Sequence, residues 1–217
     1  MTPFRLLAIT PPTGPVPGDM PDRWFAGHDS VGLAVLLREP GLSPIALLSS
    51  DRLAALRRRC RERAIPLLLS IDPDTSLPPL PPDIAGLHLR RDPTLAQLAA
   101  VPRDSLLLGR SCHGAPQPGH ELVDYTLFAP VFPPLSSHKP PAGLPALRAW
   151  TTSPGATVIA LGGITPTTAP ACLAAGAHGL AGIGVFFGEP AQVEQDVAAL
   201  RDLVAAHARH VEPLPPR

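Results

Sequence analysis

Short apolar runs recur along the chain and are separated by polar, proline-rich or helix-forming segments. The apolar runs have the length of β-strands and lie at 4–10, 31–38, 66–71, 84–89, 105–111, 123–128, 158–161 and 179–183. Segments that can form helices follow several of them, at 51–63, 93–100, 144–150, 169–175 and 191–209. Strands that alternate with helices in this way form parallel sheets. The pattern therefore predicts a single (β/α)₈ TIM barrel in which some outer helices are short or irregular.

Proline marks the boundaries of these units. The 217 residues include 31 prolines, which cluster between apolar runs at 11–21, 73–82 and 130–145. Because proline removes a backbone donor, the segment between the third and fourth runs is not expected to form a regular helix. Neither a repeat of fixed period nor a linker interrupts the order of units, and the length suffices for one large core. We therefore expect residues 1–217 to form one domain.

Charge and cysteine content narrow the classes of function. The formal net charge is zero and the pI is about 7.1, whereas a nucleic-acid-binding surface needs a basic excess. No apolar run approaches the roughly 20 residues of a membrane span, and the amino-terminal run is too short for a signal peptide. Cys60, Cys112 and Cys172 are odd in number and widely spaced, which fits neither a disulfide framework nor a zinc site. We expect a cytoplasmic protein with no nucleic-acid, membrane or metal partner. The sequence does not decide between a monomer and a homo-oligomer.

Two glycine-containing loops stand out between 157 and 187. A strand-length apolar run ends in Gly162 and Gly163, and after a helical segment a second run ends in Ile183 and Gly184. In a parallel barrel, two such loops on neighbouring strand ends can offer backbone N–H groups to one anion, and barrel enzymes often bind phosphate after strands seven and eight. The four residues are therefore candidate phosphate ligands. The alternative is that the glycines are only turn residues.

The alternation of side chains along the run at 105–111 points to a catalytic candidate. Leu107, Gly109, Ser111 and His113 share one face, and Cys112 lies on the other, so a Cys–His catalytic pair is not expected. Catalytic groups of TIM barrels lie at the carboxyl ends of strands, which is where His113 falls. A structural histidine is the alternative interpretation.

Two cationic residues are candidates for substrate binding. Arg38 ends the second run on the same face as small residues, so it would point into the top of the barrel, although a surface arginine has the same pattern. Lys139 lies in a long loop, 129–142, that can form either a lid over the active face or an ordinary surface excursion.

Five segments together resemble the thiamine phosphate synthase/TenI superfamily. They cover nearly the whole chain in the same order: LLREPG (36–41), IAGLHLRRD (84–92), LLGRSCHG (107–114), DYTLFAPVFPP (124–134), and IALGGITP (159–166) with AAGAHGLAGIGVFF (174–187). The resemblance implies a (β/α)₈ barrel that binds a thiazole phosphate at its carboxyl-end face.

The superfamily contains two activities, and one of them is weakly supported by this sequence. The synthase joins a pyrimidine pyrophosphate to a thiazole phosphate and uses magnesium. Its Gln-x-Arg-Glu-Lys pattern falls on 36–40, where Arg38 is kept but Leu36 and Pro40 replace the glutamine and the lysine. The lysine of its later loop corresponds only approximately to Lys139.

The magnesium ligands of the synthase are also altered. Its Asn-Asp pair falls on Ser70 and Ile71, and an isoleucine cannot bind a metal. Asp72 could serve only after a shift, and Asp92 lies one residue before the place of the second aspartate. A departing pyrophosphate needs several positive partners, so much of that site is lost.

The other activity, that of TenI-like thiazole tautomerases, needs neither pyrophosphate nor metal. The Gly-Arg-Ser-x-His pattern of this branch falls on 109–113, which implies that His113 moves the proton. Ser111 would orient the ring or the substrate carboxylate, and Arg38 would bind that carboxylate. The sequence thus predicts an isomerase that aromatises a carboxythiazole phosphate without a cofactor. The alternatives are a magnesium-dependent thiamine phosphate synthase and a non-catalytic barrel that binds a thiazole or thiamine phosphate.

Overall fold

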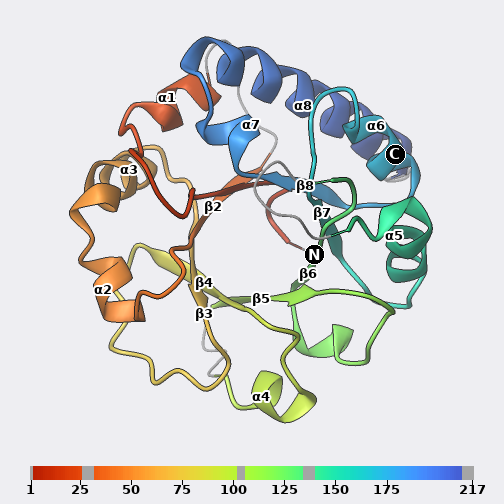
Figure 1. Cartoon of the computed structure of the whole chain (residues 1–217), viewed down its shortest axis with the longest axis horizontal. Helices are drawn as coiled ribbons and strands as arrows, with labels where there is room; N and C mark the ends of the chain where they lie inside the picture. The colour runs from red at the N-terminus through yellow and green to blue at the C-terminus, as the bar shows by residue number, and fades with distance from the viewer. Residues whose placement is uncertain (1, 26–31, 102–105, 134–139, 212–217) are drawn as a thin grey trace, which may run out of the picture.

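The computed structural model is a closed barrel of eight parallel strands surrounded by helices (Figure 1). It describes residues 2–25, 32–101, 106–133 and 140–211. The strands pair in sequence order, and β1 closes the barrel against β8. Their bounds are β1 Leu6–Ile9, β2 Leu33–Leu37, β3 Leu67–Ile71, β4 Ile84–Leu89, β5 Leu107–Cys112, β6 Tyr125–Phe128, β7 Val158–Leu161 and β8 Gly179–Gly182. The TIM barrel predicted from the sequence is confirmed.

The outer helices are uneven in length, as predicted. Helix α8 is the longest, and Figure 1 shows it along the outside of the barrel between α1 and α6. Between β3 and β4, where proline is dense, the chain forms no helix. The bounds are α1 Met20–Trp24, α2 Pro44–Leu48, α3 Asp51–Glu62, α4 Leu95–Ala99, the 3₁₀ turn η1 His120–Leu122, α5 Gly143–Thr151, α6 Ala169–Ala174, α7 Gly184–Phe187 and α8 Pro190–Val211.

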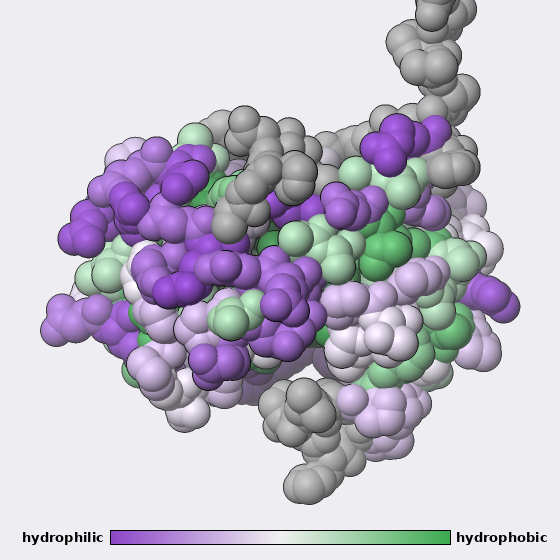
Figure 2. Space-filling model, turned by 90° about the horizontal axis from the view of Figure 1, so that it is seen from above, coloured by the Kyte–Doolittle hydropathy of each residue, from purple (hydrophilic) through white to green (hydrophobic). Residues whose placement is uncertain are grey.

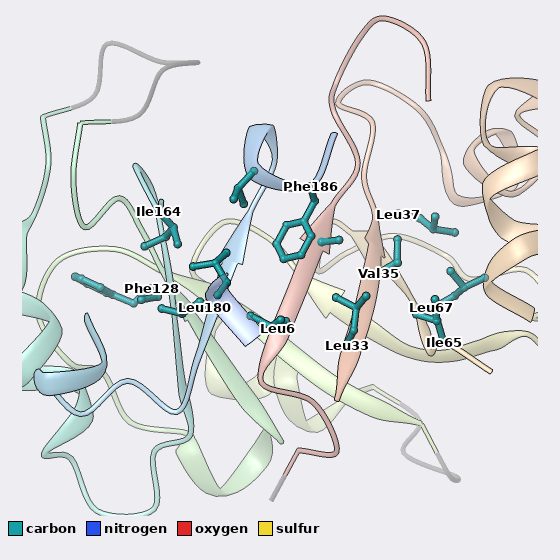
Figure 3. Packing of buried hydrophobic residues seen from close by; sticks show 14 of the residues in the cluster. Leu6, Leu33, Val35, Leu37, Ile65, Leu67, Phe128, Ile164, Leu180 and Phe186 are labelled. Atoms are coloured by element: carbon teal, nitrogen blue, oxygen red, sulfur yellow. The ribbon is translucent and has the colours of Figure 1, made fainter. Parts of the chain in front are cut away.

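Most of the hydrophobic core lies between the strands and the helices. In β2, Leu33, Val35 and Leu37 belong to this outer layer, and Figure 3 shows them turned toward the same side of the strand. Full burial of one such side chain contributes about 1.5–3 kcal/mol. Ala34 and Leu36 alternate with them and face the barrel interior. The continuous burial of β2 follows from this arrangement, because both faces of the strand are covered.

The barrel interior holds two aromatic rings, those of Phe4 and Tyr125, among smaller apolar side chains. Tyr125 is fully buried, and its ring makes an edge-to-face contact with Phe4 at a centroid distance of 5.3 Å. It lies directly over Gly109, where a Cβ atom would come within 2.1 Å of the Tyr125 ring. The glycine of β5 is therefore required by the tyrosine of β6. Toward the carboxyl ends of the strands the interior becomes polar, beginning with the Tyr125 hydroxyl, His88 and Ser111.

Ion pairs join the helices on one side of the molecule. Asp22 of α1 accepts from Arg59 of α3 at 2.6 Å and also pairs with Arg63. Figure 2 shows that hydrophilic residues gather on this side of the surface. Within the described residues, no helix is long and apolar enough to cross a membrane.

Candidate functional site

The carboxyl ends of the eight strands meet at one rim of the barrel, which we call the mouth. Two polar features lie there: a buried hydrogen-bonded row on β4, β5 and β6, and a group of charged residues that follow β2, β3 and β4. The glycine loops follow β7 and β8 on the other side of the same ring.

His88 is the centre of the buried row. Its Nδ1 lies 2.9 Å from the hydroxyl of Tyr125, and its Nε2 lies 2.9 Å from Oγ of Ser111. Burial, together with the nearby charges of Arg38 and Arg90, lowers the pKa of His88 to about 3. The imidazole is therefore neutral at physiological pH, with one nitrogen as donor and the other as acceptor. This row fixes the Ser111 hydroxyl at the upper inner face of β5.

His113 lies two residues beyond Ser111 and is held by Asp92. Its Nδ1 is 3.0 Å from Oδ2 of Asp92, and its backbone N–H donates to Oδ1 at 3.0 Å. The side chain of His113 is 42% exposed, so the ring is oriented by the carboxylate and still accessible. Asp92 and the preceding Arg91 both have positive φ, 46° and 63°, a strained conformation for non-glycine residues that is typical of functional loops.

Three arginines gather at the ends of β2 and β4. Arg38 is half-buried, and the Thr10 hydroxyl fixes its backbone by accepting from its N–H at 2.8 Å and donating to its carbonyl at 2.9 Å. Arg90 Nη2 lies 2.9 Å from Oδ2 of Asp72, and Arg91 Nε lies 3.1 Å from Oδ1 of the same carboxylate. Burial and the charge of Arg90 lower the pKa of Arg38. Asp72 thus pairs with Arg90 and Arg91, and it does not pair with Arg38.

A cavity of about 340 Å³ opens beside Arg90 and Arg91. Its walls come from the loop after β2, including Gly41 and Ser43, and from the ends of β3 and β4. Ser70, Asp72 and Arg90 contribute the polar part of the wall. The cavity thus lies at the mouth and carries positive charge on one side.

The donor set does not fit the magnesium ion that the synthase resemblance implies. The side chain of Ile71 offers no oxygen ligand, Asp72 lies in ion pairs with Arg90 and Arg91, and Asp92 is hydrogen-bonded to His113. Among the residues that the structure describes, no three His, Cys, Asp or Glu side chains gather closely enough to hold a metal ion. Hard divalent cations need several oxygen ligands. The ends of β3 and β4 place the guanidinium groups of Arg90 and Arg91 where such ligands would be needed.

The two glycine loops come together because β7 and β8 pair in register, with Leu161 opposite Ala181. Gly162 and Gly163 have φ of 103° and 62°, and a Cβ atom on either would come within 2.7 Å of the loop after β6. Packing alone therefore explains these two glycines.

Gly184 differs from the other glycines of the two loops. A Cβ atom there would meet nothing within 4 Å, and its φ is not in the left-handed region. The fold has no steric need for glycine at this position. Its exposed backbone, beside the half-buried Ile183, is open to a ligand.

The predicted site residues fall into three places. Ser111 lies in the buried row, His113 is paired with Asp92, and Arg38 belongs to the arginine group. Lys139 lies outside the described residues. Cys112 faces the outer core and is buried, which raises its pKa to about 12, so the predicted separation from His113 is confirmed.

Sequence reasoning missed His88, Tyr125 and the paired role of Arg90. The signal was present: alternation along 84–89 places Gly86 and His88 on one face and carries Arg90 onto the same side. The same alternation places Ser111 on the inner face of β5.

Comparison with known proteins identifies the family. The profile described as thiamine monophosphate synthase matches residues 31–186. The chain belongs to this family. A thiamine-phosphate synthase of Bordetella avium is 36% identical over 170 residues, which cover 72% of this chain and 76% of that protein. One of Limosilactobacillus fermentum is 32% identical over 161 residues, with 70% and 73% covered.

A solved structure shares the fold of this thiamine monophosphate synthase family member. The thiamine phosphate pyrophosphorylase of Pyrococcus furiosus superposes with a TM-score of 0.69 at 22% identity, over 94% of this chain and 96% of that one. The family is one of thiamine-biosynthesis enzymes. Its named relatives fit the synthase interpretation better than the tautomerase interpretation that the sequence favoured.

Proposed function

We propose that this chain is a thiamine phosphate synthase, which joins a pyrimidine methyl diphosphate to a thiazole phosphate. The observation that carries the proposal is the presence of two anion-binding features on one barrel mouth. The arginines follow β2 and β4, whereas the glycine loops follow β7 and β8, on the far side of the ring. A synthase must hold two phosphorylated substrates at once, and relatives with that name are 30–36% identical to this chain.

The reaction needs stabilisation of charge more than transfer of a proton. The C–O bond of the pyrimidine methyl diphosphate breaks, and its electron pair leaves with the diphosphate. The lone pair of the thiazole ring nitrogen forms the new C–N bond, which gives a thiazolium product and free pyrophosphate. No proton moves in this step. Catalysis then depends on positioning and on positive charge near the leaving group.

The residues of the mouth divide these tasks. Guanidinium groups of Arg38 and Arg90 bind and neutralise the leaving diphosphate. Backbone N–H groups of Ile183 and Gly184 bind the thiazole phosphate. Ser111, held by His88, contacts a polar atom of the ring that reacts between them.

Incubation of the purified protein with both substrates tests this proposal. Thiamine phosphate is measured by fluorescence after oxidation to its thiochrome, and pyrophosphate by a coupled colour assay. We expect the two products to appear in equal amounts. Binding of both substrates without any product would instead indicate a non-catalytic barrel.

A second candidate function, thiazole tautomerase, is favoured by the pair of His113 and Asp92. A histidine oriented by a carboxylate through Nδ1 is a common general base, and Nε2 would face the substrate. Arg38 would then bind the carboxylate of a carboxythiazole phosphate. The test is the appearance of the aromatic thiazole by absorbance, corrected for spontaneous isomerisation. Turnover here, with no thiamine phosphate from the first assay, would reverse the order of the two candidates.

A further inference from the structure

Arg38 carries a charge that the described part of the protein does not neutralise. Its backbone is fixed by Thr10, but no hydrogen bond or ion pair joins its guanidinium to another described residue. The neighbouring carboxylate, Glu39, is directed elsewhere and pairs with Arg52 at 2.7 Å. A half-buried arginine of this kind is disfavoured unless an anion completes its surroundings.

The second guanidinium, Arg90, is only partly satisfied. Its Nη2 binds Asp72, but its Nε is buried and has no hydrogen-bond partner among the described residues. Arg38 follows β2 and Arg90 follows β4, and their charges add to the effect of burial in lowering the pKa of His88. Two like charges held together in this way favour binding of an anion between them.

Ser70 adds a third unsatisfied group in the same place. It is only 6% exposed, its Oγ has no hydrogen-bond partner within the described chain, and it lines the cavity together with Arg90. Buried hydroxyl groups are nearly always hydrogen-bonded. Asp72 Oδ1 lines the same cavity and also has no hydrogen-bond partner among the described residues, although it lies 3.1 Å from Arg91 Nε. The Ser70 hydroxyl and the Arg90 N–H are the groups that can donate to a ligand with acceptor oxygens.

We infer that Arg38, Ser70 and Arg90 form a diphosphate-binding site that works without a divalent metal. Arg91 contributes from the exposed rim, where its side chain is 78% exposed and shares Asp72 with Arg90. This inference rests on the proposed synthase function and adds the way in which the leaving group is held. Guanidinium groups here take over the charge neutralisation that a metal ion would otherwise supply.

Both the charge and the shape of the guanidinium groups favour an anion at this site. Guanidinium groups bind phosphate oxygens through two parallel N–H bonds, which gives both strength and orientation. A magnesium ion at the same place would be repelled by Arg38 and Arg90. It would also have to take Asp72 or Asp92 away from its present partner. The site therefore selects an anion directly.

Calorimetric titration with inorganic pyrophosphate in the presence of EDTA tests the inference. We expect binding in EDTA, with an affinity that excess Mg²⁺ does not raise. Arg38→Gln and Arg90→Gln should each weaken it by at least about tenfold, because each removes charge-assisted hydrogen bonds. Arg61→Gln is the matched control, because Arg61 is an exposed residue of α3, far from the mouth, and the substitution changes net charge equally.

The two arginine variants differ in how much they disturb the folded protein, so a loss of binding can be distinguished from misfolding. Arg90→Gln removes one of the two ion-pair partners of Asp72. Arg38 has no carboxylate partner among the described residues, so Arg38→Gln leaves no carboxylate unpaired. Gly184→Val is titrated in parallel, and it should keep pyrophosphate binding because the glycine loops belong to the other anion site. Each variant is first checked for a cooperative thermal transition.

The outcomes separate this inference from the proposed function. Pyrophosphate binding that requires Mg²⁺, or that survives Arg38→Gln in a folded protein, overturns the inference even if thiamine phosphate is formed. Metal-free binding that both arginine variants weaken supports it even if the synthase assay gives no product.

Discussion

Single side chains at the mouth have separable tasks, because the structure shows what each one already touches. Groups with internal partners, such as Ser111 and His113, are positioned before a ligand arrives. Groups that have no internal partner among the described residues, such as the Arg38 guanidinium, obtain their hydrogen-bond partners from the ligand. This distinction fixes what each substitution should change.

Gly184→Val should weaken binding of the monophosphate without affecting the fold. Space is open around the position of its Cβ, so the valine side chain fits, but it occupies the volume that phosphate oxygens need next to the backbone N–H groups. We expect the affinity for thiamine phosphate to fall by more than about tenfold in calorimetric titration. Unchanged affinity, in a variant that melts like the parent, would show that the glycine loops do not bind the phosphate.

His113→Asn distinguishes the two candidate reactions. The asparagine amide can keep a hydrogen bond to Asp92, so the loop should stay in place. Synthase chemistry moves no proton, and its rate should fall far less than the 10²–10⁴-fold loss typical of a missing general base. Tautomerase turnover, if the protein has it, should fall by that larger factor. A large loss in the synthase assay would mean that His113 itself contacts the groups that react in the synthase reaction.

Pairs of neighbouring strands determine how the interior is filled, and β5 with β6 is the tightest case. Gly109→Ala places a methyl group 2.1 Å from the fully buried ring of Tyr125, which is also held by His88 and Phe4. Overpacking of this kind typically costs about 1–3 kcal/mol or more.

Urea unfolding measures the effect, with Gly184→Ala as the control at a glycine whose surroundings are open. We expect a clear loss of stability for Gly109→Ala and little change for Gly184→Ala. Equal stabilities of the two variants would contradict the close packing of Tyr125 against Gly109.

Strands were easier to predict from the sequence than helices, for a physical reason. The apolar runs at 84–89 and 158–161 coincide with β4 and β7, because strands covered on both faces consist mainly of apolar residues. Short helices depend on capping and on tertiary packing. Helix α2 was missed although Ser43 caps it and Pro44 occupies its first turn.

The start of α6 falls at the first residue of the predicted helical segment 169–175, and not at the cap pattern four residues earlier. Thr165 followed by Pro166 has the pattern of a helix start, but the Thr165 hydroxyl accepts from the Thr168 N–H in a separate turn at 3.2 Å. The helix begins only at Ala169, after Thr168 has donated to the Gly163 carbonyl at 2.8 Å. A local turn that serves the glycine loop thus displaces the helix start.

The molecule as a whole brings together residues that no local pattern connects. Alternation along single strands predicted that Ser111 and Arg38 point inward, and the mouth is where they lie. Which groups pair was not predictable, because the contacts of His88 with Tyr125 and of Asp92 with His113 join different strands and loops. The neutralisation of Asp72 by two arginines likewise depends on the three-dimensional arrangement.

Global stability should fall on acidification because of His88. The pKa of this residue is about 3 in the folded protein and about 6.5 in the unfolded chain. Between these values the unfolded state binds more protons, so stability is full above pH 6.5 and is lost as the pH falls toward 3. The slope can reach about 1.4 kcal/mol per pH unit.

Urea unfolding between pH 4.5 and 7.5 measures this dependence, with His88→Gln for comparison. The variant should be less stable at pH 7 and should show a smaller slope, because it lacks the titrating group beside Arg38 and Arg90. His120, whose pKa burial also lowers, contributes equally to both proteins. Identical slopes would mean that His88 is not kept neutral in the fold.

A crystal structure of the protein with thiamine phosphate and pyrophosphate, grown in EDTA, tests most directly whether one barrel mouth holds two anions without a metal. The account predicts the monophosphate against the backbone of Ile183 and Gly184, and the pyrophosphate against Arg38, Ser70 and Arg90 with no ion between them. Pyrophosphate that is bound only when Mg²⁺ is added, through Asp72 or Asp92, would contradict it, as would a monophosphate located away from the glycine loops.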